Sequence, residues 1–251
     1  HRDLHSFPTR RSSDLNNQLC LNILQDFRGA EVTILDHTSI GRGWKGKQHG
    51  VGFARKTAMD HIARTASPDD ILLSLDADTT FPDGYFQSVA DTFSRIDNLV
   101  ALAVPYYHLL TGREGEDRAI LRYEIYMRHY FLSLAHLNSP YSFTALGSAM
   151  AVPVYAYRAI GGITPKLSGE DFYFLQKLRK YGSVGIWNPV MVNPAARFSD
   201  RVFFGTGPAM IRGAAGDWGS YPVYPLELFD QIGETYAMIE QMYEQTTMTP
   251  V

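Results

Sequence analysis

The stretch ILLSLDADTTFPDGYF, residues 71–86, joins a short apolar run to two aspartates and a Pro-Asp-Gly turn. Five mostly apolar residues have the length of a buried strand, which would end just before Asp76. Side chains alternate along an extended chain, so Asp76 and Asp78 are predicted to point the same way. Ligands of parallel α/β sheets bind beyond the carboxyl ends of the strands, where both carboxylates fall. Because two carboxylates repel each other, we expect a hard divalent cation, Mg²⁺ or Mn²⁺, to bind there.

Helix and strand patterns alternate on both sides of this stretch. Helices are predicted over residues 16–29, 53–66, 84–96, 117–137, 154–162, 169–182 and 226–245. Strands are predicted over residues 30–39, 71–75, 99–107, 145–153 and 183–188. The Gly-, Pro- and Arg-rich region 189–221 is predicted to be a loop. This order favours an α/β fold with a mixed, mostly parallel sheet flanked by helices.

Size, charge and cysteine content exclude several classes of protein. The chain has 251 residues and a formal net charge of -3, which gives no general attraction to nucleic acid. The single cysteine, Cys20, cannot form an intrachain disulfide. No apolar run reaches the roughly 18–20 residues of a transmembrane helix, so we expect a cytoplasmic protein.

Residues 1–15 lack apolar periodicity and resemble translated adapter sequence, so they are expected to be a non-native or disordered leader before a single domain over 16–251.

Four segments of the chain resemble, in order, the motifs of glycosyltransferase family 2. They are EVTILDHTS (31–39), GVGFARKTAMDHI (50–62), ILLSLDADT (71–79) and AIGGITPKLSGEDFYFLQKLRKYG (159–182). The resemblance implies a GT-A fold, a Rossmann-like sheet with a nucleotide-sugar half at 16–110 and an acceptor half with the C-terminal helix at 111–251. The family's first strand would precede residue 16, so it is expected to be missing here, which leaves neighbouring strands with unpaired backbone groups.

The resemblance also implies a role for each acidic residue. Asp78 would ligate a metal that bridges the donor's diphosphate, and Asp76 would contact the donor's ribose or sugar directly or through the metal's water. Asp171 would be the catalytic base, with Glu170 holding acceptor or donor hydroxyls. The activity implied is inverting, metal-dependent transfer from a nucleotide-diphosphate sugar, a UDP-sugar first of all. The acceptor would be a glycan or a lipid-linked molecule, reached from the inner face of a membrane.

Four further residues are expected to bind the donor. By the same resemblance, Asp36 would contact the nucleotide base and Arg55 would lie near the nucleotide. Arg197 and Arg201 could form a basic flap over the diphosphate. Each has a plainer alternative: an Asx turn for Asp36, a solvated helix face for Arg55, and a solvated surface loop for the two later arginines.

Plain structural alternatives exist for the acidic motifs too. Asp76 and Asp78 could simply cap the turn that follows the strand. Ser168 and Asp171 have the spacing of a capping box at the start of a helix. The aromatic helix over 117–137, which includes Tyr123, could line an acceptor groove, but such residues more often belong to the core.

Two other functions fit parts of the sequence. DADTT matches the DxDx[TV] string of haloacid-dehalogenase phosphatases, in which Asp76 would be the nucleophile and Lys166 would serve beside Glu170 and Asp171. The third reading is a catalytically inactive nucleotide-sugar-binding fragment. Binding of a nucleotide without transfer would favour this last reading.

Overall fold

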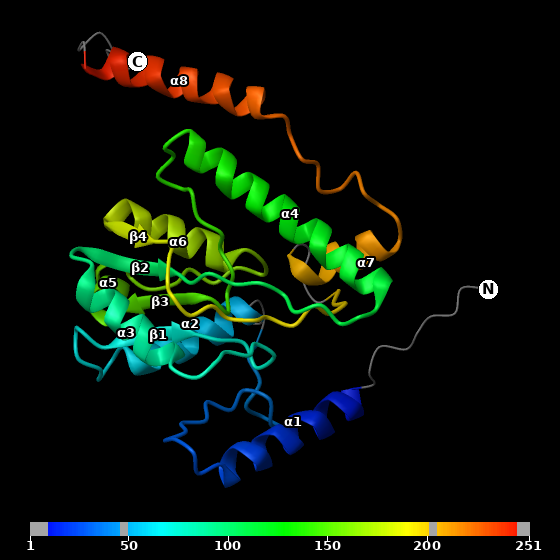
Figure 1. Ribbon diagram of the computed structural model, residues 1–251. Helices are drawn as coiled ribbons and strands as arrows, with labels where there is room; N and C mark the ends of the chain where they lie inside the picture. Colours follow the sequence, from blue (N-terminus) through cyan, green and yellow to red (C-terminus); the bar gives the residue numbers. More distant parts are fainter. Residues whose placement is uncertain (1–9, 46–49, 201–204, 245–251) are drawn as a thin grey trace.

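The computed structural model describes residues 10–45, 50–200 and 205–244. The helices are α1 (Arg10–Asp26), α2 (Val51–Ile62), α3 (Tyr85–Arg95), α4 (Glu114–His136), α5 (Val154–Ala159), α6 (Glu170–Tyr181), α7 (Thr206–Ala214) and α8 (Leu226–Glu244). The strands are β1 (Ile71–Ser74), β2 (Leu99–Ala103), β3 (Met150–Pro153) and β4 (Ser183–Gly185). The α/β class predicted from the sequence is confirmed, with helices flanking a small mixed sheet (Figure 1).

The sheet has the order β1-β3-β2-β4. β3 runs antiparallel to both β1 and β2, and only β2 and β4 are parallel. The prediction of a mostly parallel sheet is therefore wrong for the part of the chain that the structure describes. The reason lies in the connection from β2 to β3. α4 carries the chain back past the sheet, and the segment 137–149 then returns it to the end where β2 finishes, so Met150 at the start of β3 pairs with Ala103 at the end of β2 (Figure 1). Among the described strands, β1 has a neighbour on its β3 side only.

The predicted strand over 30–39 is also wrong. This segment has no regular structure and pairs with none of the described strands. Val32 is 39% exposed, and Ile34 and Leu35 are only partly buried. A β-rich composition gives a strand only where a partner strand and a covering face are present, and this segment has neither.

Helices cover both faces of the sheet. On one face, Met59 of α2 and Phe174 and Leu178 of α6 pack against residues such as Leu72 and Val152. On the other face, α3 packs against the sheet through two of its side chains, both fully buried. They are Tyr85 and Val89. β2 is buried along its whole length because helices lie on both sides of it.

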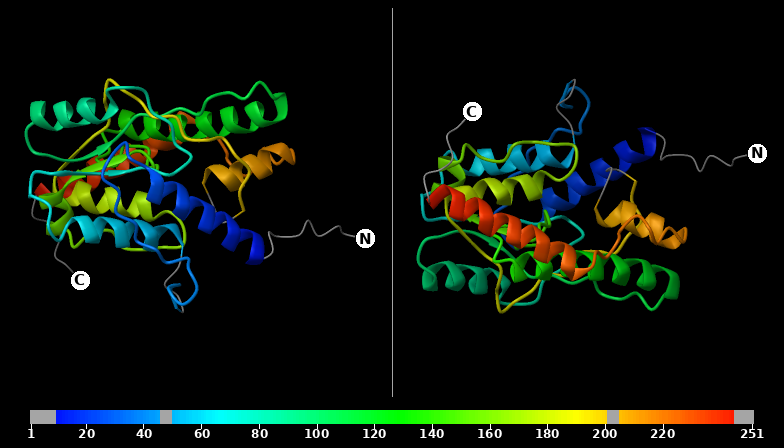
Figure 2. Two further views of the ribbon diagram at one scale, coloured as in Figure 1. Left: turned by 90° about the horizontal axis from the view of Figure 1, so that it is seen from below. Right: turned by 90° about the horizontal axis from the view of Figure 1, so that it is seen from above.

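The remaining helices lie outside these two layers. α7 was predicted to be loop, but Met210 and Ala209 are buried and α7 packs closely against α4. α1 and α8 lie at opposite ends of the molecule in Figure 1, and Figure 2 shows α8 crossing over α4. α1 begins at Arg10, within the residues expected to be a leader. Among the described residues, no helix is long and apolar enough to cross a membrane.

Candidate functional site

Arg55 is the centre of a polar cluster that joins three parts of the fold. It projects from α2, and its guanidinium donates through Nε to Ser74 Oγ at 2.9 Å and through Nη2 to Asp76 Oδ1 at 2.6 Å. Its Nη1 donates to Glu170 Oε1 at the start of α6. The Arg55 side chain is only 10% exposed, so these three acceptors hold it in one place. The end of β1 and the first turn of α6 therefore meet at a single cation.

Gly147 provides the space that the guanidinium needs. A Cβ added at residue 147 would lie 2.2–2.6 Å from the guanidinium atoms of Arg55. Real Cβ atoms do not approach other heavy atoms so closely, so any side chain at residue 147 would displace Arg55. The carbonyl of Gly147 also accepts a hydrogen bond of 2.5 Å from Ser74 Oγ. Ser74 thus links the guanidinium to the backbone on its far side.

Asp78 has an arginine partner of its own. Arg197, in the loop before α7, places its Nη2 atom 2.6 Å from Oδ2 of Asp78. Paired backbone hydrogen bonds of 2.9 and 2.8 Å between Thr80 and Asn193 hold this loop beside the segment after β1. The structure therefore brings Arg197 to Asp78, as the flap interpretation requires. Contact of either residue with a donor stays a prediction.

Glu170 and Asp171 occupy the first turn of α6. The helix begins after Gly169, which has a φ of 71° and supplies no side-chain cap, so the predicted capping box with Ser168 as N-cap is wrong. The backbone N–H of Phe172 donates to Asp171 Oδ1 at 2.8 Å. Acids at this end of a helix are favoured by its macrodipole.

The pKa values of Glu170 and Asp171 are both raised above their usual range. Burial raises the pKa of Glu170, and the neighbouring charge of Asp171 raises it further, while Arg55 lowers it. Burial likewise raises the pKa of Asp171, against the lowering effect of the Phe172 N–H and of Arg55. A carboxylate with a raised pKa is a stronger base, as a role for Asp171 in proton removal would need.

Asp36 belongs to a different neighbourhood. Its carboxylate accepts hydrogen bonds from the backbone N–H groups of Thr38 at 2.9 Å and Ser39 at 3.0 Å, and Arg42 lies 3.4 Å away. Hydrogen bonds from Ser39 and Thr38 lower the pKa of Asp36 well below its usual range. The Asx-turn alternative is confirmed. Asp36 also lines an open hollow of about 690 Å³ between α1 and the 34–42 turn, so a contact with a nucleotide base stays a prediction.

The acidic residues offer hard oxygen ligands to a metal, but none of them forms a ready-made metal cluster. In the described part of the chain, no group of three or more His, Cys, Asp or Glu side chains has the geometry to hold a metal ion. One oxygen of Asp76 and one oxygen of Asp78 are each engaged by an arginine. A cation at this place would thus need oxygens from a bound phosphate or from water as well. Arg201, the other expected flap residue, lies outside the described residues.

No family model, curated protein or solved structure matches this chain.

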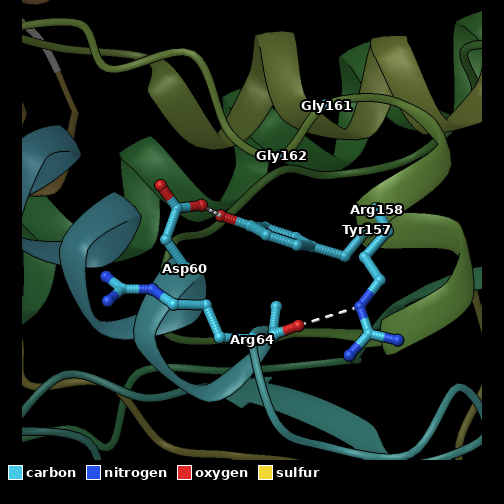
Figure 3. Close-up of a pocket in the computed structure, with 7 residues that line it drawn as sticks. Asp60, Arg64, Tyr157, Arg158, Gly161 and Gly162 are labelled. Atoms are coloured by element: carbon cyan, nitrogen blue, oxygen red, sulfur yellow. Dashed lines mark hydrogen bonds between the residues drawn. The ribbon is translucent and has the colours of Figure 1, made fainter.

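A separate pocket lies near the C-terminal end of α2. It has a volume of about 350 Å³ and is lined in part by Gly161 and Gly162 (Figure 3). Figure 3 shows the Tyr157 hydroxyl directed at Asp60, to which it donates at 2.7 Å. Arg158 Nε donates to the Ala63 carbonyl at 2.8 Å. These contacts hold α5 against α2, and none of the lining residues belongs to the Arg55 cluster.

Sequence reasoning missed Ser74 and Gly147, although both contact Arg55. The only available signal for Ser74 was a hydroxyl residue inside the apolar run of 71–75. Gly147 lies in the segment ALGSA, where nothing in the sequence indicates that a guanidinium fills the space beside it. The Lys166 ammonium lies over the Tyr173 ring, 4.1 Å from its centre, and among the described residues the ion pair of Glu170 is with Arg55, so the phosphatase interpretation gains no support here.

Proposed function

We propose that this chain is an inverting, metal-dependent glycosyltransferase that moves a sugar from a nucleotide-diphosphate donor to an acceptor hydroxyl. One observation carries the proposal. Arg55 contacts both Asp76, at the end of β1, and Glu170, beside Asp171 at the start of α6. Residues assigned to the donor and to the acceptor chemistry, 94 positions apart in the sequence, are thus linked by one side chain.

Asp171 is the proposed base. Its carboxylate takes the proton of the acceptor hydroxyl while that oxygen forms a bond to the anomeric carbon. The bond between this carbon and the diphosphate oxygen breaks on the opposite face, and its electron pair leaves with the nucleoside diphosphate. The raised pKa of Asp171 suits the task, since a base is most effective when its pKa approaches the working pH.

Asp76 and Asp78 are the residues that would hold Mg²⁺ or Mn²⁺. When bound, such an ion offsets the negative charge that develops on the leaving diphosphate. We assign Arg197 a share in this role. Its ion pair with Asp78 supports the assignment, since a guanidinium can pair with a phosphate oxygen as well as with a carboxylate. Asp36 is the proposed contact for the nucleotide base, with a UDP-sugar as the first donor to test.

The first experiment measures donor binding and hydrolysis. UDP-, GDP- and dTDP-sugars are titrated calorimetrically with Mn²⁺, and release of the nucleoside diphosphate is then followed. Asp171→Asn is expected to keep donor binding and to lose about 10²–10⁴-fold in turnover. Asp97→Asn, at an exposed position after α3, is the matched control.

Three outcomes contradict the proposal. Undiminished turnover in Asp171→Asn removes the base. Binding without any turnover favours an inactive nucleotide-sugar-binding protein. Release of phosphate from p-nitrophenyl phosphate, with beryllofluoride trapped on Asp76, favours the phosphatase.

A further inference from the structure

The contacts of Arg55 leave it little freedom to meet a donor. All three of its guanidinium nitrogens donate to the protein, to two acceptors at the end of β1 and to one at the start of α6. Ser74 ends β1, Asp76 follows it, and Glu170 begins α6. The backbone at Gly147 closes one side of the guanidinium.

We infer that Arg55 is a positioning residue, which fixes the start of α6 relative to the end of β1 and so sets the place of Asp171. This inference rests on the proposed function. Arg55 acts through Glu170, to which it is bound and which precedes Asp171 directly. It makes no direct contact with the reacting groups in this role, and so differs from the nucleotide contact that the sequence predicted.

Only a planar, forked cation can donate to Ser74, Asp76 and Glu170 at the same time. A guanidinium presents donors along fixed directions, whereas the ammonium of a lysine is a compact point charge. Lysine would therefore keep the charge at residue 55 but could not bridge Ser74, Asp76 and Glu170 together. Displacing a catalytic group by about 1 Å can cost about 100-fold in rate.

Chemical rescue separates positioning from a general structural role. Arg55→Ala should lower kcat about 100-fold. Guanidinium at low millimolar concentration should raise the kcat of this variant at least about tenfold, because it fills the vacated space beside Gly147. Methylammonium should not restore it, and Arg55→Lys should remain close to Arg55→Ala. Gly147→Ala, which would push its methyl group into the guanidinium, should reproduce the loss, while Gly115→Ala, with open space around its new Cβ, should not.

A second readout needs no turnover. Guanidinium should raise the melting temperature of Arg55→Ala more than that of the wild type or of Arg64→Ala, because a ligand that binds only the folded state stabilises it. If the wild type turns over no donor, the proposed function fails while this thermal shift still tests the positioning role. Wild-type kcat with a raised KM in Arg55→Ala, full activity in Arg55→Lys, or the lack of a selective thermal shift would each overturn the inference.

Discussion

Replacing Arg55 by Met should destabilise the protein chiefly through Glu170. The Glu170 side chain is 4% exposed, so without the guanidinium its charge would be buried and unpaired. Removing one partner of a buried ion pair costs about 3–5 kcal/mol. Asp76 adds little to this cost, because its side chain is 42% exposed and water can replace the lost contact. Ser74 keeps its hydrogen bond to the Gly147 carbonyl.

The expected loss is large enough to measure in two ways. For a chain of this length, about 1 kcal/mol corresponds to about 2–4 °C in Tm, so Arg55→Met should melt about 6–20 °C lower. Urea denaturation followed by circular dichroism should show the same loss in the free energy of unfolding. Arg64→Met, an exposed arginine just after α2, should stay within about 0.5 kcal/mol of the wild type.

A double-mutant cycle identifies the cause. Glu170→Met alone leaves Arg55 bound to Asp76 and should cost less than Arg55→Met. The double variant removes both charges and should regain stability relative to Arg55→Met, because neutral replacement of a buried pair is often tolerated. If the two losses simply add, the uncompensated charge of Glu170 is not the source of the instability. An Arg55→Met variant as stable as the wild type would refute the reasoning altogether.

Two predictions concern the rest of the fold. The backbone N–H of Thr111 donates to the Asp117 carboxylate and lowers its pKa, so this carboxylate stabilises the fold above the unfolded pKa near 3.8 and loses that effect as the pH falls further. Asp117→Asn should therefore lower Tm at neutral pH and match the wild type in acid; a pH-independent gap between the two melting curves would contradict this. Gly182→Ala should cost about 1–3 kcal/mol in urea denaturation, because the new Cβ would lie 2.5 Å from Val100 Cγ1. If Gly182→Ala and Gly115→Ala are equally stable, β2 moves at Val100 without a measurable cost, and the prediction is wrong.

Local sequence signals predicted most helices and the strand that carries the candidate site. The apolar run at 71–75 and the polar turn after it gave β1, and the amphipathic pattern before Gly182 gave α6. Helix periodicity and terminating residues act within a few positions of one another, so they can be read without the fold. The start of α6 shows the limit of this reading, since Gly169 with its positive φ took the place expected of Ser168.

Strand direction and pairing could not be read in the same way. The apolar segment of β3 has the same composition whichever way it runs, and its direction follows from the segment 137–149, which returns the chain to the end where β2 finishes. The segment at 30–39 has the residues of a strand, but none of the described strands pairs with it. α7 was missed because its helical stripe is short and lies between glycines, and its burial depends on contact with α4.

Which cations lie beside Asp76 and Asp78 also depended on tertiary contacts. The sequence predicted that Asp76 and Asp78 need a positive partner, and the structure gives each of them an arginine. Glu170 shares one of these arginines, so two guanidiniums serve this group of carboxylates. With Asp171 included, the cluster keeps an excess of negative charge, in keeping with the raised pKa of Glu170. The arginines therefore reduce the repulsion that argued for a divalent cation without removing it, and the metal stays a proposal for the partner of the charge that is left.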